Sequence, residues 1–273
     1  MSHRISNLVQ SVGLLAILVL QVALVGWVFA GALGALLAVG LGVFAATQAN
    51  RMPDWALLRM IRARPITVRQ APGLYEVTRR LSSRAGLSTV PRLALIASPV
   101  PNAMTVGTPE APVIGLTQGL LRQLPERELE AVLAHEISHV AHRDLGLLAM
   151  AQAYGRITAT AGQIGLFLVP VALLLGATQL AWVGMALALG PVASTALTLA
   201  VSRQREFAAD GLAVELTGDP AALASALQRI EARGRWYARW FGMGSQAGPD
   251  WLRSHPATEA RVERLRVRPA STR

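Results

Sequence analysis

Two histidines and a glutamate stand at a spacing that can bind a metal ion and activate water. Residues 135–139 read His-Glu-Ile-Ser-His, which places His135 and His139 four positions apart. On a helix these side chains share one face, so both imidazoles can bind one Zn²⁺ ion, and Glu136 can reach water on that ion. The alternative is a surface helix whose polar residues face water. Residues 131–134 are all apolar, which argues against it because unpaired polar groups are costly there.

A third ligand is needed, because a catalytic zinc ion binds three protein groups and keeps one position open for water. The chain has no Cys, which excludes a thiolate ligand and a Cys nucleophile. Glu206 is the best candidate, since Asp210 follows four residues later and would accept a hydrogen bond from a ligating imidazole. The alternative is a solvated helix with an Arg205/Asp210 charge pattern. Three other histidines are weaker candidates, namely His3 near the N-terminus, His142 at the surface or behind the ligands, and His255.

Apolar spacing predicts the elements that must position these residues. A helix is expected from Pro125, which suits a first turn, to about His142. Further helices are expected at residues 73–87, 203–216 and 221–233 and from residue 259. Short strands are expected at residues 93–96, 104–106 and 113–116. The polar part of the chain is therefore predicted to be α+β, with the metal ligands on two separate helices.

Composition predicts that much of the remaining chain lies in a membrane. Charged residues make up 15% and hydrophobic ones 52%, against about 25% charge in average soluble proteins, and this excludes a disordered chain. Residues 5–50 and 157–202 contain no Asp, Glu, Lys or Arg. Each block fits two spans of about 20 apolar residues, which we place at 9–28, 31–47, 159–177 and 180–201. A cleaved signal peptide is the alternative for the first span, but a second span follows at once.

The placement of arginine predicts the orientation. The net charge of +10 comes from arginine alone among the cationic residues, because the chain has no Lys. Arginines flank both apolar blocks and are absent from their inner turns, so the positive-inside rule puts both termini in the cytoplasm. No basic patch interleaved with aromatic residues supports nucleic-acid binding. A transporter or channel would carry ionisable groups inside its spans, and these blocks lack Asp, Glu, Lys and Arg.

These patterns divide the chain into four segments. Residues 1–50 and 157–202 are predicted to be transmembrane hairpins, and residues 51–156 and 203–273 the two halves of one cytosolic domain. Glu206 follows Ser202 by four residues, or about 6 Å of helix, so the metal is expected close to the cytoplasmic membrane face. Substrates near such a site would be membrane proteins or their cytosolic loops and termini.

Both metal motifs resemble those of the HtpX family of integral-membrane zinc metalloproteases, relatives of the CAAX prenyl proteases. The resemblance rests on residues 135–144 and 202–210, on Pro-Asn-Ala-Met at 101–104 and on Ser-His-Pro at 254–256, and it spans almost the whole chain. It implies a mainly α membrane protein with four transmembrane helices in two hairpins and a cytosolic α+β zincin-like (gluzincin) metalloprotease domain. It also implies one Zn²⁺ per chain, in a multi-pass protein of the plasma or inner membrane.

The same resemblance implies roles for individual residues. The zinc ligands would be His135, His139 and Glu206, with Glu136 as the catalytic base. Asn102 would lie in the substrate cleft, and His255 would help to stabilise the oxyanion. The alternatives are that Asn102 is only a turn residue after a proline, and that His255 is only a surface loop residue beside a proline. The substrate-binding segment would be Asn102, Ala103 and Met104. The family usually has an aromatic residue where Met104 stands, which leaves cleft contacts at this position open.

The expected activity is zinc-dependent hydrolysis of peptide bonds. Zinc would lower the pKa of its water toward about 7, and Glu136 would take the proton and deliver it to the leaving amine. The strand near residues 103–106 would pair with an extended substrate. We predict an endopeptidase acting on membrane or misfolded proteins, with the role in protein quality control that the resemblance implies. The alternatives are a non-catalytic scaffold or chaperone with the same fold and a CAAX-type prenyl-protein protease.

Overall fold

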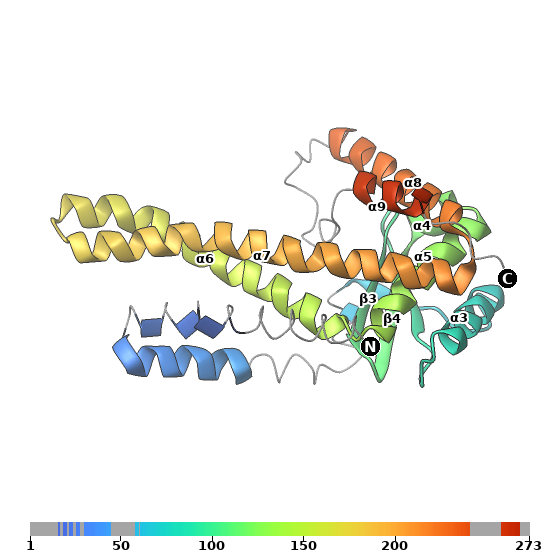
Figure 1. Ribbon diagram of the computed structural model, residues 1–273, viewed down its shortest axis with the longest axis horizontal. Coiled ribbons are helices and arrows are strands. Elements are labelled where there is room, and N and C mark those ends of the chain that lie inside the picture. Colours follow the sequence, from blue (N-terminus) through green and yellow to red (C-terminus); the bar gives the residue numbers. More distant parts are fainter. Residues whose placement is uncertain are drawn as a thin grey trace. The chain divides into compact units, whose positions relative to one another are not determined.

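The computed structural model describes residues 16, 19–20, 22–23, 26–27, 30–44, 58–59, 61–240 and 258–267 (Figure 1). The chain forms two compact units, each built from two separate stretches of sequence. One unit comprises Met1–Arg51 and Leu147–Val201, and the other comprises Met52–Gly146 and Ser202–Arg273. The second unit contains the sheet and both metal motifs.

A four-stranded sheet in the second unit has the strand order β1-β2-β4-β3. The strands are β1 (Ala63–Pro65), β2 (Arg92–Ile96), β3 (Ala103–Thr108) and β4 (Ala111–Thr117). β2 and β4 run parallel, whereas β1 with β2 and β3 with β4 are antiparallel. The three predicted strands fall within β2, β3 and β4, and β1 was not predicted. β3 is an edge strand of this sheet, so only one side of its backbone pairs with another strand of the described chain.

Helices pack around this sheet and bury one apolar core. They are α3 (Pro72–Arg84), α4 (Gln118–Gln123), α5 (Glu126–Ala141), α8 (Pro220–Trp240) and α9 (Thr258–Val267). The core joins Leu81 of α3, Ile114 of β4, Leu133 of α5 and Leu223 of α8, all at most 1% exposed. Each such leucine or isoleucine stabilises the fold by about 1.5–3 kcal/mol. Because α5 contributes to this core and also contacts β3, its register against the sheet is fixed.

The long helices α6 (Leu145–Leu174) and α7 (Thr178–Thr217) form a hairpin (Figure 1). Gly165 permits close packing there, since a side-chain carbon on it would lie 2.5 Å from the Gly184 carbonyl oxygen. The connecting turn contains Gly176 at φ +65, slightly before the boundary between the predicted spans 159–177 and 180–201. α7 is continuous where the sequence predicted a span followed by a separate helix.

In the stretches that the structure describes, no helix is both long and apolar enough to cross a membrane. The predicted spans at 9–28 and 31–47 lie only partly within these stretches, where residues 30–44 are helical. The four-span architecture therefore stays a prediction.

Candidate metal centre

Helix α5 carries the His-Glu-Ile-Ser-His segment into the interior of the second unit. Glu126 and Glu128 lie in its first turn, where carboxylates favour the positive end of the helix dipole. Its buried residues are Glu128 and every residue from Ala131 to Val140, which include both histidines and Glu136. Polar side chains at such depth need partners, because burying them without compensation is costly.

Three buried side chains converge on one point. His135 Nε2 lies 3.2 Å from His139 Nε2 and 3.4 Å from Glu206 Oε2, and His139 Nε2 lies 3.7 Å from Glu206 Oε1. A tetrahedral ion with bonds of about 2.0–2.1 Å holds its ligand atoms about 3.3 Å apart. The three donor atoms therefore have the spacing that such an ion requires, and the two predicted helices supply them.

A carboxylate stands behind the first histidine. Asp210 Oδ1 lies 3.0 Å from His135 Nδ1, on the far side of the ring from Glu206. Arg261 of α9 donates to Asp210 from Nε at 2.8 Å and from Nη2 at 2.6 Å, and its Nη1 lies 2.8 Å from Glu206 Oε2. This arginine is 2% exposed and was not predicted to be part of the site. α9 is also held by Arg264, whose guanidinium lies 4.7 Å from the centroid of the Phe207 ring.

These contacts shift the pKa of several groups in the metal-free protein. Burial and the Arg261 charge lower the pKa of His135, but hydrogen bonds to Asp210 and Glu206 outweigh them and raise it to about 9. Burial, followed by the charge on His135, lowers the pKa of His139. His135 therefore holds a proton at neutral pH while His139 does not, and metal binding must displace that proton.

Glu136 is held by the edge strand. The Thr105 hydroxyl of β3 donates to Glu136 Oε2 at 2.6 Å. Asn102, Ala103 and Met104 lie immediately before Thr105, and Asn102 is fixed by its backbone N–H donating to Thr117 Oγ1 at 2.8 Å. Thr105 was not predicted as a site residue, and local sequence spacing gives no signal for it.

Of the other residues considered from the sequence, the structure describes His142 and Arg205 but not His3 or His255. His142 caps the C-terminal end of α5 in a partly exposed position and is outside the group of three donors. Burial, followed by the charge on His139, lowers its pKa. His255 lies outside the residues that the structure describes, as does His3. Arg205, considered above as a surface partner of Asp210, is buried and donates to Asp144.

Comparison with known proteins gives a consistent assignment. The family model of peptidase family M48 matches residues 69–268. A "Protease HtpX homolog" of Nostoc punctiforme is 35% identical and covers 95% of both chains. A protein of the same name from Pyrococcus furiosus is 33% identical over 89% of both chains. The crystal structure of S. mikatae Ste24p superposes with a TM-score of 0.52 at 19% identity, over 83% of this chain and 57% of that one, which shows a similar fold.

Proposed function

The chain belongs to peptidase family M48, and we propose that it is a zinc-dependent endopeptidase. The predicted resemblance to HtpX-like proteases is confirmed by relatives that match along nearly the whole chain. The observation that carries the proposal is the convergence of His135, His139 and Glu206, whose donor atoms all lie within 4.8 Å of one another.

Zinc is the metal that we propose for this site, with one ion per chain. Two imidazoles and one carboxylate form a donor set that catalytic zinc sites use, and three protein ligands leave a fourth position for water. When bound, the ion would polarise the scissile carbonyl and lower the pKa of its water.

Glu136 is the proposed general base and acid. Thr105 occupies Oε2 of this carboxylate, which leaves Oε1 to take a proton from the attacking water and deliver it to the leaving amine. Because Thr105 belongs to β3 and Glu136 to α5, this hydrogen bond keeps the base at a fixed distance from the edge strand. Asp210 holds the ring of His135 by its Nδ1 and so keeps Nε2 directed toward Glu206.

Substrate is proposed to bind as an added strand on β3. The edge of this strand that pairs with no other described strand offers backbone N–H and C=O groups to an extended peptide, which would be recognised with little sequence preference. The segment formed by Asn102, Ala103 and Met104 begins this edge and is the proposed substrate-binding segment. His255 is proposed to assist the oxyanion.

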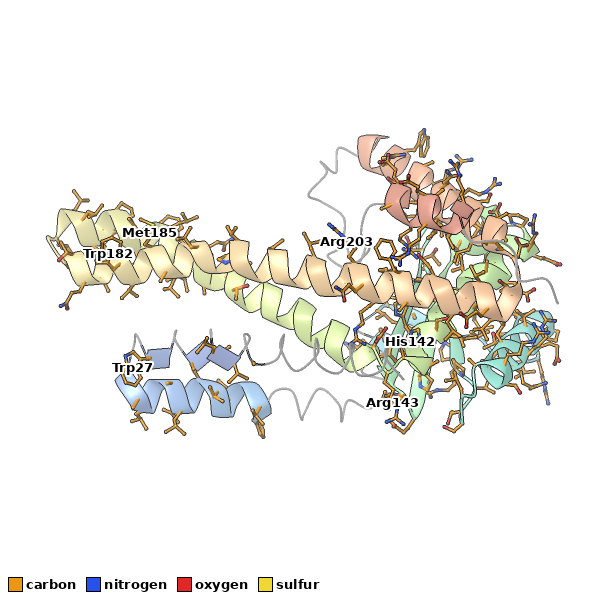
Figure 2. All side chains as sticks on the ribbon, viewed as in Figure 1. Trp27, His142, Arg143, Trp182, Met185 and Arg203 are labelled. Carbon is orange, nitrogen blue, oxygen red and sulfur yellow. The ribbon has the colours of Figure 1, made fainter. Side chains whose placement is uncertain are left out.

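The proposed location of the enzyme is the plasma or inner membrane, with both termini in the cytoplasm. Residues 1–50 and 157–202 would form the membrane hairpins, and residues 51–156 and 203–273 the protease domain. Large apolar side chains exposed on α6 and α7 support a membrane location for the second hairpin, because such surfaces are unfavourable in water. Among them are Phe167 at 78% and Leu174 at 87%, and Trp182 at 74%, which Figure 2 labels. Membrane proteins and misfolded proteins are the substrates that we propose, in protein quality control.

The test compares three proteins purified in detergent: the wild type, Glu136→Gln and the control Glu130→Gln on the same helix. Bound zinc is measured, and casein and a membrane protein are offered as substrates. All three should bind one zinc ion, and Glu136→Gln should cut at least about 100-fold more slowly. Wild-type protein without zinc would reject the metal assignment. Equal cutting by wild type and Glu136→Gln would remove Glu136 from the mechanism.

A further inference from the structure

We infer that Asp144 is a positioning residue for His139, and that Arg205 holds Asp144 in place for this task. The inference rests on the proposed zinc site and adds two residues to it. Asp144 lies five positions after His139, beyond the end of α5, so its role depends on how the chain turns there. Neither residue was predicted to act on a metal ligand.

The end of α5 turns the chain back beneath His139. The backbone N–H of Asp144 donates to the His139 carbonyl at 3.0 Å, and the N–H of Arg143 donates to the Val140 carbonyl at 3.0 Å. These two bonds form a Schellman motif, with Arg143 in the left-handed region at φ +58. Residues other than glycine rarely adopt this conformation, and it persists where the surrounding contacts impose it.

The turn brings the carboxylate to the ring nitrogen that the metal does not need. Asp144 Oδ2 lies 3.4 Å from His139 Nδ1, whereas His139 Nε2 faces His135 and Glu206. A carboxylate at Nδ1 favours the tautomer with its proton on that nitrogen, which leaves the lone pair on Nε2. Asp144 therefore prepares His139 to bind through Nε2.

Arg205 supplies the charge that Asp144 requires. Asp144 is 1% exposed, and an unpaired carboxylate at this depth would be strongly unfavourable. Arg205 Nη1 donates to Asp144 Oδ1. Because Arg205 immediately precedes Glu206, α7 provides one metal donor and also the cation that fixes the carboxylate behind another.

The arrangement repeats what Asp210 and Arg261 do at the first histidine. Asp210 faces His135 Nδ1 at 3.0 Å and receives two hydrogen bonds from Arg261. Each histidine of the centre is thus backed by a buried aspartate, and each aspartate by a buried arginine. α7 contributes one residue to each set, Asp210 to the first and Arg205 to the second, while Arg261 comes from α9 and Asp144 from the turn after α5.

The experiment measures zinc affinity of the detergent-purified full chain by competition with a chelator. The variants are Asp144→Asn and the matched control Asp219→Asn, which weakens a carboxylate–arginine pair with Arg127 near the other end of α5. Asp144→Asn should weaken zinc binding ten- to a hundredfold, while Asp219→Asn should leave it unchanged. Cobalt-substituted Asp144→Asn should also show a shifted d–d absorption spectrum, which a general loss of stability would not produce.

Zinc affinity of Asp144→Asn within twofold of wild type overturns the inference, and so does an equal loss in both variants. Should Asp144→Asn fail to fold, ¹⁵N-histidine spectra of zinc-loaded wild type test the inference instead. The inference requires that His139 binds zinc through Nε2 and carries a proton on Nδ1. Binding through Nδ1 refutes the role of Asp144. The proposed function fails separately, if wild type neither binds zinc nor cuts.

Discussion

Replacing Arg261 by methionine should destabilise the metal-free protein strongly. The guanidinium is buried and contacts two buried carboxylates, Asp210 at 2.6 and 2.8 Å and Glu206 at 2.8 Å. Methionine fills part of the volume but leaves both carboxylates without this positive partner. The loss should therefore come from uncompensated charge more than from packing.

The expected loss of stability follows from the burial of Arg261 and of the carboxylates that it contacts. Removing one partner of a buried ion pair costs about 3–5 kcal/mol. For a domain of this size each kcal/mol lowers the melting temperature by roughly 2–4 °C, so Arg261→Met should lower it by roughly 6–20 °C. Zinc bound at the proposed site would bring positive charge next to Glu206, so the same substitution should cost less in the zinc-loaded protein.

The assay is thermal unfolding in detergent, with and without chelator. The matched control is Arg79→Met, which removes an arginine from an exposed pair with Glu76, where the two side chains are 59% and 68% exposed. That variant should melt close to wild type, because exposed pairs contribute little. Adding Asp210→Asn to Arg261→Met should cost less than the sum of the two single changes. Equal melting temperatures for Arg261→Met and Arg79→Met would refute the reasoning.

Two further predictions concern Glu136 and Asp210. Thr105→Val removes the hydroxyl that donates to Glu136 and should lower kcat by about tenfold or more, while Thr105→Ser should retain activity; equal rates for both variants in peptide hydrolysis would contradict this. Burial raises the pKa of Asp210, but hydrogen bonds with Arg261 and His135 outweigh it and lower the pKa to about 2. A carboxyl with a depressed folded pKa stabilises above its unfolded pKa, so the metal-free protein should lose roughly 2 kcal/mol as pH falls from about 4 to about 2. Asp210→Asn should remove that part of the pH dependence of unfolding. An unchanged dependence of stability on pH in this variant would contradict the prediction.

The sequence predicted those parts of the site in which the geometry of a single helix determines how two side chains lie relative to one another. His135 and His139 share a face because they are four residues apart, and the same spacing relates Glu206 to Asp210. The strands β2, β3 and β4 were predicted from short apolar runs between turn residues. The helix predicted at residues 73–87 is α3, which ends at Arg84, two residues before Gly86 at φ +70.

The parts that sequence reasoning missed depend on contacts between distant residues. Thr105 and Glu136 are 31 positions apart, and Arg261 and Asp210 are 51 positions apart. Arginine is also the most common charged residue of this chain. The presence of an arginine therefore does not by itself indicate a functional position. β1 has only three residues and ends in Pro65, and it forms because β2 offers it a pairing edge. Packing of the core sets these contacts, and local spacing carries no information about them.

The charges buried around the centre indicate why it suits a divalent cation. Among the residues that the structure describes, four carboxylates surround it, and two buried guanidiniums accompany them. The carboxylates are Glu136, Asp144, Glu206 and Asp210, and the guanidiniums are Arg205 and Arg261. With both imidazoles neutral, as metal ligands must be, the group carries a formal charge of about −2, which one divalent ion balances. Without the ion, His135 takes up a proton at a pKa of about 9 and offsets only part of this charge. The two arginines therefore reduce the negative charge of four carboxylates from about −4 to about −2, the value that a single divalent cation would neutralise.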